Sequence, residues 1–197
     1  MPASVRTLTL ADVALPRPDV LRNALLIVGA SLATALAARI AFPLPWTPVP
    51  VTGQSFAVLL TGMVLGSRRG FLALALYLAE GATGLPVFAG GVAGPSALLG
   101  PTGGYLLAFP LAAAMTGFLA ERGWDRRGLT TLAAMLIGSG VIFAGGLAWL
   151  GYFVPPARLL GTGLLPFIPG DVVKASLASL AFPFAWRWIN RRSGIDA

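Results

Sequence analysis

Long apolar runs are the feature that most restricts what this chain of 197 residues can fold into. A helix that crosses a bilayer needs about 20 mostly apolar residues, and somewhat fewer where the bilayer adapts. The chain offers six candidate runs, at residues 22–42, 52–66, 69–86, 103–120, 129–151 and 164–189. Only 11% of its residues are charged, whereas soluble domains carry about 25%. We therefore predict an all-α integral membrane protein, with six transmembrane helices in a compact bundle and structured external loops.

The distribution of basic residues predicts how the chain sits in the membrane. With the N-terminus inside, eleven of the fourteen basic residues fall on cytoplasmic segments and one, Arg158, on an external loop. The polar N-terminal stretch does not resemble a signal peptide. We expect a cytoplasmic tail at 1–21, a membrane domain at 22–190 and a cytoplasmic tail at 191–197, in the bacterial cytoplasmic (inner) membrane.

Several function classes are disfavoured by composition. The net charge of +7 does not indicate nucleic acid binding, because the arginines are scattered in twos and threes between apolar runs. The chain has no cysteine and no histidine, which removes thiolate nucleophiles, disulfides and nearly all transition-metal sites. No GxxxxGK[ST] motif for binding ATP is present. We expect no metal, no cofactor and no enzymatic activity.

Four charged residues lie in or beside the apolar runs, and the predicted topology places all of them toward the external side: Arg39, Glu80, Asp171 and Lys174. A charge that faces lipid costs roughly 2.5–3.5 kcal/mol, so such residues are rarely accidental. Arg39 and Glu80 are equally consistent with helix-end side chains that reach the interface. A purely structural ion pair is the alternative reading of Asp171 and Lys174.

The sequence around Asp171 favours a binding site. Pro169 and Gly170 interrupt the sixth run, so we expect a helix to begin at Asp171, with its carboxylate near unpaired backbone amides. Lys174 lies three residues on and projects from the same face. Broken helices of this kind recur at binding sites inside membranes. Asp171 is predicted to accept hydrogen bonds from a small polar ligand, and Lys174 to donate one.

Two external loops are predicted to cover this site. Residues 42–56 contain four prolines, which stiffen the loop, and Trp46, which anchors it. Residues 80–109 are apolar and rich in glycine, a composition that suits tight turns rather than disorder. We expect both loops to pack across the outer mouth of the bundle as a lid.

Small residues recur at helical spacing along the first run, where Ala30, Ala33, Thr34 and Ala37 contribute to a broad surface. Such surfaces let helices approach closely in lipid. Packing inside the bundle and docking of another subunit are equally consistent with the pattern.

Four segments together resemble the biotin-specific substrate-binding component (S component) of energy-coupling factor (ECF) transporters, the BioY family. They are PVTGQSFAVLLTG (50–62), GLPVFAGG (84–91), LLGPTGGYLLAF (98–109) and LPFIPGDVVKASLAS (165–179), in the order of that family. The resemblance covers roughly residues 22–190.

The resemblance implies a six-helix bundle with both termini inside and an external biotin site closed by the first and third external loops. It implies that Asp171 and Lys174 bind the ligand and that Tyr105, with its glycine neighbour Gly104, lines the site. Gln54, Phe88 and Trp46 are further candidates. The implied partners are a transmembrane coupling (T) protein and cytoplasmic ATPase (A) subunits, which would supply the ATP-driven step. The first span resembles the face that family members present to the coupling protein.

Other readings are possible from the residues. The same scaffold would suit another vitamin, although the loop motifs match the biotin branch. An intramembrane serine protease using Ser96 would have only Lys174 as a base. A structural subunit or channel is disfavoured, because a pore would expose a polar stripe along several spans, whereas polarity here is confined to one depth.

Overall fold

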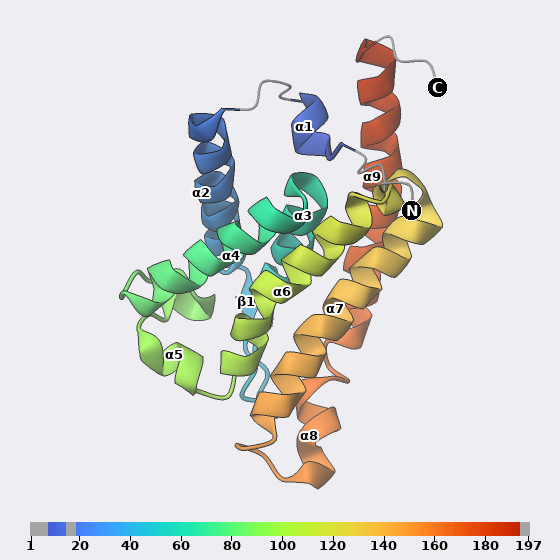
Figure 1. Ribbon diagram of the computed structural model, residues 1–197. Helices are drawn as coiled ribbons and strands as arrows, with labels where there is room; N and C mark the ends of the chain where they lie inside the picture. The colour runs from blue at the N-terminus through green and yellow to red at the C-terminus, as the bar shows by residue number, and fades with distance from the viewer. Residues whose placement is uncertain (1–7, 15–18, 194–197) are drawn as a thin grey trace, which may run out of the picture.

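The computed structural model describes residues 8–14 and 19–193, with side chains as far as residue 189. Within this part, six helices of 12 or more residues follow one another: α2 (Val20–Ala37), α3 (Gln54–Leu65), α4 (Ser67–Ala82), α6 (Gly103–Ala120), α7 (Gly128–Leu150) and α9 (Ile168–Ser193). Successive members alternate in direction (Figure 1). The start of α2, the α3–α4 and α6–α7 turns and the end of α9 therefore lie at one end of the molecule, here called the terminal end.

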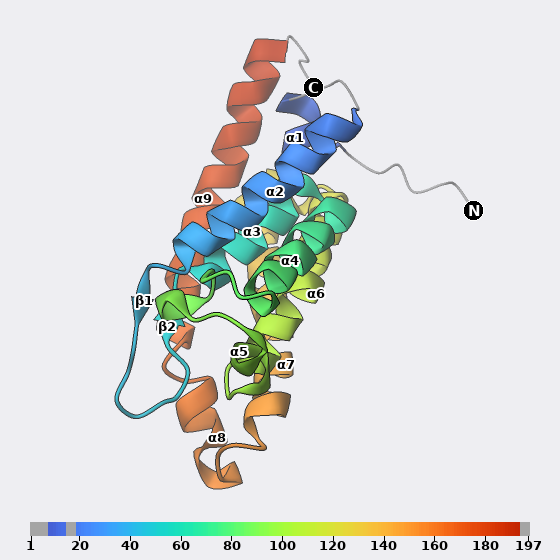
Figure 2. The ribbon, with the colours of Figure 1, turned by 90° about the vertical axis from the view of Figure 1, so that its left-hand side faces the viewer.

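The opposite end, here called the loop end, carries most of the short elements (Figure 2). Strands β1 (Ala41–Phe42) and β2 (Val51–Thr52) form an antiparallel hairpin in which Ala41 pairs with Thr52. The glycine-rich segment contains a 3-10 turn, η1 (Ala89–Gly91), and the short helix α5 (Pro95–Leu99). Helix α8 (Pro156–Gly163) completes this end. The two long loops are thus structured, as the sequence predicts.

Four helical stretches are long and apolar enough to cross a membrane: Val20–Ala37, Gly103–Ala120, Gly128–Leu150 and the stretch Pro156–Ile189, which joins α8 to α9. Helix α3 is apolar but has only 12 residues, and α4 has 16. A helical membrane protein with several spans is therefore supported. The count of six spans stays a prediction, because α3 and α4 fall short of the usual length.

The outer surfaces of α2 and α9 are apolar. Large hydrophobic side chains are exposed along both helices: Leu21, Leu25, Leu32 and Leu36 on α2, and Val173, Leu177, Leu180 and Phe184 on α9. A soluble monomer rarely exposes an apolar surface of this extent, whereas lipid contacts it without cost. These faces fit the hydrocarbon interior of a bilayer.

Polar contacts at the terminal end hold the N-terminal segment against the bundle. Helix α1 (Leu10–Ala14) buries Leu10 and Ala11, and its Asp12 carboxylate accepts hydrogen bonds from Arg69 at 2.7 Å and Arg22 at 3.3 Å. The predicted N-terminal tail therefore contains a docked helix. Arg6 and Arg17, which contribute to the predicted cytoplasmic charge, lie outside the described residues.

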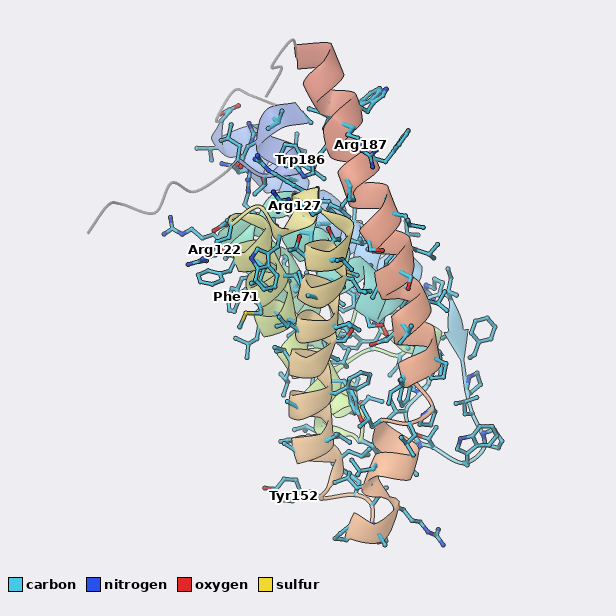
Figure 3. All side chains as sticks on the ribbon, turned by 90° about the vertical axis from the view of Figure 1, so that its right-hand side faces the viewer. Phe71, Arg122, Arg127, Tyr152, Trp186 and Arg187 are labelled. Carbon is cyan, nitrogen blue, oxygen red and sulfur yellow. The ribbon has the colours of Figure 1, made fainter. Side chains whose placement is uncertain are left out.

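The other turns of this end are compact and basic. Gly66 has φ of 85° between α3 and α4, a conformation that favours glycine. The next amide, that of Ser67, donates to the Glu121 carboxylate at 2.7 Å, which links this turn to the end of α6. Figure 3 shows Arg122, Arg127 and Arg187 at the terminal end and Tyr152 at the loop end. This separation matches the predicted charge asymmetry.

Candidate ligand-binding site

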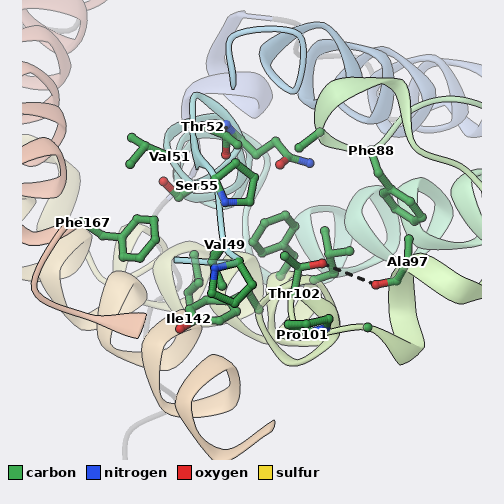
Figure 4. Close-up of a pocket in the computed structure, with 18 of the residues that line it drawn as sticks. Val49, Val51, Thr52, Ser55, Phe88, Ala97, Pro101, Thr102, Ile142 and Phe167 are labelled. Carbon is green, nitrogen blue, oxygen red and sulfur yellow. Dashed lines mark hydrogen bonds between the residues drawn. The ribbon is translucent and has the colours of Figure 1, made fainter. Parts of the chain in front are cut away.

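A cavity of about 340 Å³ lies inside the loop end. Its wall comes from the hairpin and the start of α3 (residues 48–55), from the segment 88–102, and from α6, α7 and α9. Figure 4 shows these elements converging on the hollow, with Val49, Phe88, Ile142 and Phe167 among the apolar side chains that line it. A mostly apolar cavity with a few polar groups is typical of small-molecule sites.

Asp171 and Lys174 line this cavity together. The Lys174 ammonium lies 3.3 Å from the Asp171 Oδ1 atom, and the two side chains are 21% and 9% exposed respectively. Lys174 also donates to the Ser55 hydroxyl at 2.8 Å and to the Thr52 carbonyl at 3.1 Å. One lysine on α9 therefore holds the end of β2 and the start of α3.

These bonds change the role expected for Lys174. An ammonium has three protons to donate, and here each has an acceptor. Lys174 can contact a ligand only by exchanging one of them. Asp171 Oδ2 accepts no hydrogen bond within the described residues, and the Ser55 hydroxyl, which accepts from Lys174, keeps its own proton to donate. The wall thus offers an acceptor and a donor side by side.

The expectation that a helix begins at Asp171 is wrong. Helix α9 begins at Ile168, so Pro169 and Gly170 belong to its first turn. The Asp171 amide donates to the Phe167 carbonyl at 3.0 Å, and the carboxylate receives a hydrogen bond from Lys174 rather than from a backbone amide in the part of the chain described. Proline is tolerated in a first turn, where its missing N–H removes no helical bond. Asp171 still lies near the positive end of the helix.

Three more predicted residues line the cavity: Gln54, Phe88 and Tyr105. The Gln54 side-chain amide donates to the Tyr77 hydroxyl, and Tyr77 in turn donates to the Val87 carbonyl at 2.9 Å. The Tyr105 hydroxyl donates to the Gly163 carbonyl at 2.7 Å, at the end of α8. Both tyrosines thus join a helix to a segment of the loop end.

The structure does not bring Trp46 or Gly104 to the cavity wall. Trp46 is 62% exposed at the far part of the hairpin connection. Gly104 lies against α7, where a Cβ would fall 2.2 Å from Trp149 Cβ and 2.4 Å from the Gly145 carbonyl oxygen. Gly104 therefore serves close packing of α6 on α7.

The covers of the cavity also differ from those implied by the resemblance. The first external connection, with the hairpin, and the second, with η1 and α5, provide most of the covering wall. From the third connection only Phe167 lines the cavity. The third connection still contacts the first, because Thr47 donates to the Thr162 carbonyl at 2.8 Å.

Arg39 and Glu80 have other partners than the pair on α9. Arg39 donates to the Pro86 carbonyl at 2.7 Å, and Glu80 accepts from the Ser31 hydroxyl at 2.5 Å. Neither lines the cavity. Of the four membrane charges, only Asp171 and Lys174 therefore line the cavity.

Sequence reasoning passed over several lining residues. Ser55 lines the cavity and directly follows Gln54 in the TGQS segment. Its position beside a predicted site residue is the signal in the sequence that could have identified it. Phe109, Ile142, Phe143 and Phe167 gave no signal, because apolar residues that line a cavity look like any others in an apolar run.

The small residues of α2 divide between two faces. Thr34 is buried and donates to the Ala30 carbonyl at 2.9 Å, and Ala30 and Ala37 are partly buried. Ala33 is exposed. Of the four predicted docking residues, Ala33 alone lies fully on the outer face, and Thr34 serves internal packing.

Comparison with known proteins places this architecture in a family. The sequence model described as "BioY family" matches residues 6–191. The chain belongs to the BioY family. A relative from Thermotoga maritima named "Biotin transporter BioY" is 40% identical over 159 residues, covering 80% of this chain and 87% of the relative. Another of the same name, from Rhizobium etli, is 38% identical over 165 residues, covering 77% and 85%.

One solved structure has the same fold as this BioY-family chain. It is described as "Crystal structure at 2.1 A of the S-component for biotin from an ECF-type ABC transporter". The TM-score is 0.71 over 90% of this chain and 93% of that one, at 24% sequence identity. The similarity establishes the membrane bundle fold for this chain.

Proposed function

We propose that this chain binds biotin in the loop-end cavity and takes it up as the substrate-binding component of an ECF-type transporter. The observation that carries the proposal is the polar group at the cavity wall, Asp171 with Lys174 and Ser55, in a chain of the BioY family. The ureido ring of biotin offers two N–H donors and a carbonyl acceptor. Asp171 Oδ2 suits one N–H, and the Ser55 hydroxyl suits the carbonyl. The apolar wall suits the remaining body of the ligand.

Calorimetric titration of the purified chain in detergent tests the proposal. We expect biotin to bind and thiamine and riboflavin not to bind. Asp171→Ala should weaken biotin binding roughly tenfold to 150-fold, the scale of a hydrogen bond to a charged group. Val173→Ala is a matched control, because Val173 is 58% exposed on the outer face of the same helix. Unchanged affinity in Asp171→Ala would remove Asp171 from the site, and binding of another vitamin instead would redirect the assignment.

The proposal extends to the membrane and to partners. Six spans, with α3 and α4 as short ones, would put both termini in the cytoplasm and the cavity on the external side of the inner membrane. We propose that this chain itself uses no cofactor. ATP would be used by partner ATPase subunits, which a transmembrane coupling protein connects to this chain. The named S component of similar fold supports this arrangement.

Docking of the coupling protein on α2 is tested at Ala33. Ala33→Leu adds bulk to an exposed position, so it should spare biotin binding and reduce uptake by the assembled transporter. Ala181→Leu makes the same change on the exposed face of α9 and should leave uptake unchanged. Equal effects of the two substitutions would argue against a docking face on α2.

A further inference from the structure

Tyr77 lies behind the cavity and connects two parts of its wall. It is fully buried on α4 and does not itself line the cavity. Its hydroxyl contacts the side-chain amide of Gln54, a residue that lines the cavity. The same hydroxyl contacts the carbonyl of Val87, which precedes the lining residue Phe88. Its ring meets the Phe88 ring edge to face, with centroids 5.5 Å apart.

The hydrogen-bond inventory of these groups fixes the orientation of Gln54. A phenol has one proton, and a backbone carbonyl can only accept. Since the Tyr77 proton goes to the Val87 carbonyl, the phenol oxygen can only accept from Gln54. Gln54 must therefore turn its NH₂ group toward Tyr77 and leave Oε1 as the free atom. Without such a partner, the two ends of a side-chain amide are interchangeable.

The free atom of Gln54 adds an acceptor to the site. Oε1 accepts no hydrogen bond within the described residues, although Gln54 is only 3% exposed and lines the cavity. Asp171 Oδ2 is likewise unpartnered there, whereas the three protons of Lys174 are already engaged. The wall therefore presents two acceptors to a ligand, a pattern that matches a group with two N–H donors.

We propose that Tyr77 is a positioning residue that fixes Gln54 as a hydrogen-bond acceptor for an N–H group of the ligand. This assignment rests on the proposed function and deepens it, since it names the residue that sets selectivity for N–H donors at one wall of the cavity. Tyr77 acts through Gln54, so removing its hydroxyl frees the amide to turn over. The acceptor offered to one N–H of a cyclic urea would then be a group free to turn over.

A merely structural role for Tyr77 makes a different prediction. Phe88 lines the cavity and packs closely against α4, where a Cβ on Gly81 would fall 2.0 Å from its ring. If Tyr77 only supports Phe88, its loss deforms the wall and weakens every ligand by a similar factor. If it orients Gln54, its loss weakens discrimination between ligands that differ in one N–H.

The experiment compares biotin with the two biotins that carry a methyl group on one ureido nitrogen. Dissociation constants are measured for the wild type, Tyr77→Phe, Gln54→Met and the double variant. Tyr77→Phe retains the ring and its contact with Phe88. We expect it to reduce the preference for biotin over one methylated form by about tenfold, the scale of one hydrogen bond. In the Gln54→Met background, Tyr77→Phe should reduce it no further.

Gln54→Met reaches the same loss of preference with Tyr77 intact, which keeps the test valid if Tyr77→Phe folds poorly. Tyr152→Phe is the control for loss of a phenol hydroxyl, because Tyr152 is 85% exposed. An unchanged preference in Gln54→Met or in folded Tyr77→Phe would overturn the assignment, as would equal losses from Tyr77→Phe in both backgrounds. A wild type that binds biotin and both methylated forms equally would overturn it too. A wild type that binds no biotin would refute the proposed function, and the assignment with it.

Discussion

Replacing Lys174 by methionine tests whether the ion pair holds the cavity together. Methionine retains a long apolar side chain and removes all three donors. The change frees the Thr52 carbonyl and the Ser55 hydroxyl, and it leaves the Asp171 carboxylate, 9% exposed, without its cation. Two elements that cover the cavity, β2 and the start of α3, then lose their connection to α9.

The expected cost follows from the burial of the two groups. Removing one partner of a buried pair costs about 3–5 kcal/mol, because a charge is left uncompensated. Lys174 is 21% exposed, so solvent reduces the penalty toward about 3 kcal/mol. Asp171→Asn keeps an oxygen that can accept from Lys174 and should cost about 1–2 kcal/mol. The double variant buries no charge and should cost about 2 kcal/mol, well below the sum of the single changes.

Thermal unfolding in detergent measures these differences. For a chain of this size, 1 kcal/mol corresponds to about 2–4 °C in Tm, so Lys174→Met should unfold roughly 6–12 °C below the wild type. Val173→Ala, on the outer face of α9, provides the baseline for a change in this helix. Strict additivity of the single substitutions would refute the reasoning, since it would mean that Lys174 and Asp171 do not compensate each other's charge.

Two further predictions concern other parts of the bundle. Burial raises the pKa of Asp125 to about 6 from 3.8, against the opposing hydrogen bond from Trp186, so the folded chain holds this proton more tightly than the unfolded one. Stability should therefore fall as pH rises from about 4 to 6, and Asp125→Asn should gain about 3 kcal/mol at pH 8 and nothing below pH 4 in denaturant unfolding; a pH-independent difference would contradict this. Gly104→Ala should lower Tm by several degrees, because its Cβ would clash with Trp149, whereas Gly140→Ala has open space and should not; equal Tm values would contradict the packing role.

The sequence predicts the long helices well, because hydropathy reports directly on what lipid or the bundle interior can accept. Predicted runs at 103–120 and 129–151 correspond to α6 (Gly103–Ala120) and α7 (Gly128–Leu150). The ends of the shorter helices are predicted less accurately. The run at 69–86 extends past the end of α4 at Ala82, because apolar residues of the external connection continue the hydrophobic pattern without continuing the helix.

The candidate site was predictable where charge made residues conspicuous. Asp171 and Lys174 stand out in an apolar run, and both line the cavity. Gly104 was predicted to line the site but packs against α7 instead. A glycine that lets a neighbouring helix approach has the same sequence signature as one that lets a ligand approach. The hydrogen-bond partners of Lys174 could not be predicted from the sequence either, because the bond to the Thr52 carbonyl depends on how two distant segments meet in the fold.

The residues that follow α2 contact both covers of the cavity. The Ile40 carbonyl accepts from the Gly53 amide at 2.9 Å, beside the hairpin, and Arg39 donates to the Pro86 carbonyl at 2.7 Å, in the second cover. Any shift of α2 relative to the bundle must therefore break these two bonds or carry the covers with it. Each is worth about 1 kcal/mol, and Arg39 is exposed, which places its bond at the lower end. Breaking both costs about 1–2 kcal/mol, whereas the first cover is also held to α9 by the hydrogen bonds that Lys174 donates to Thr52 and Ser55.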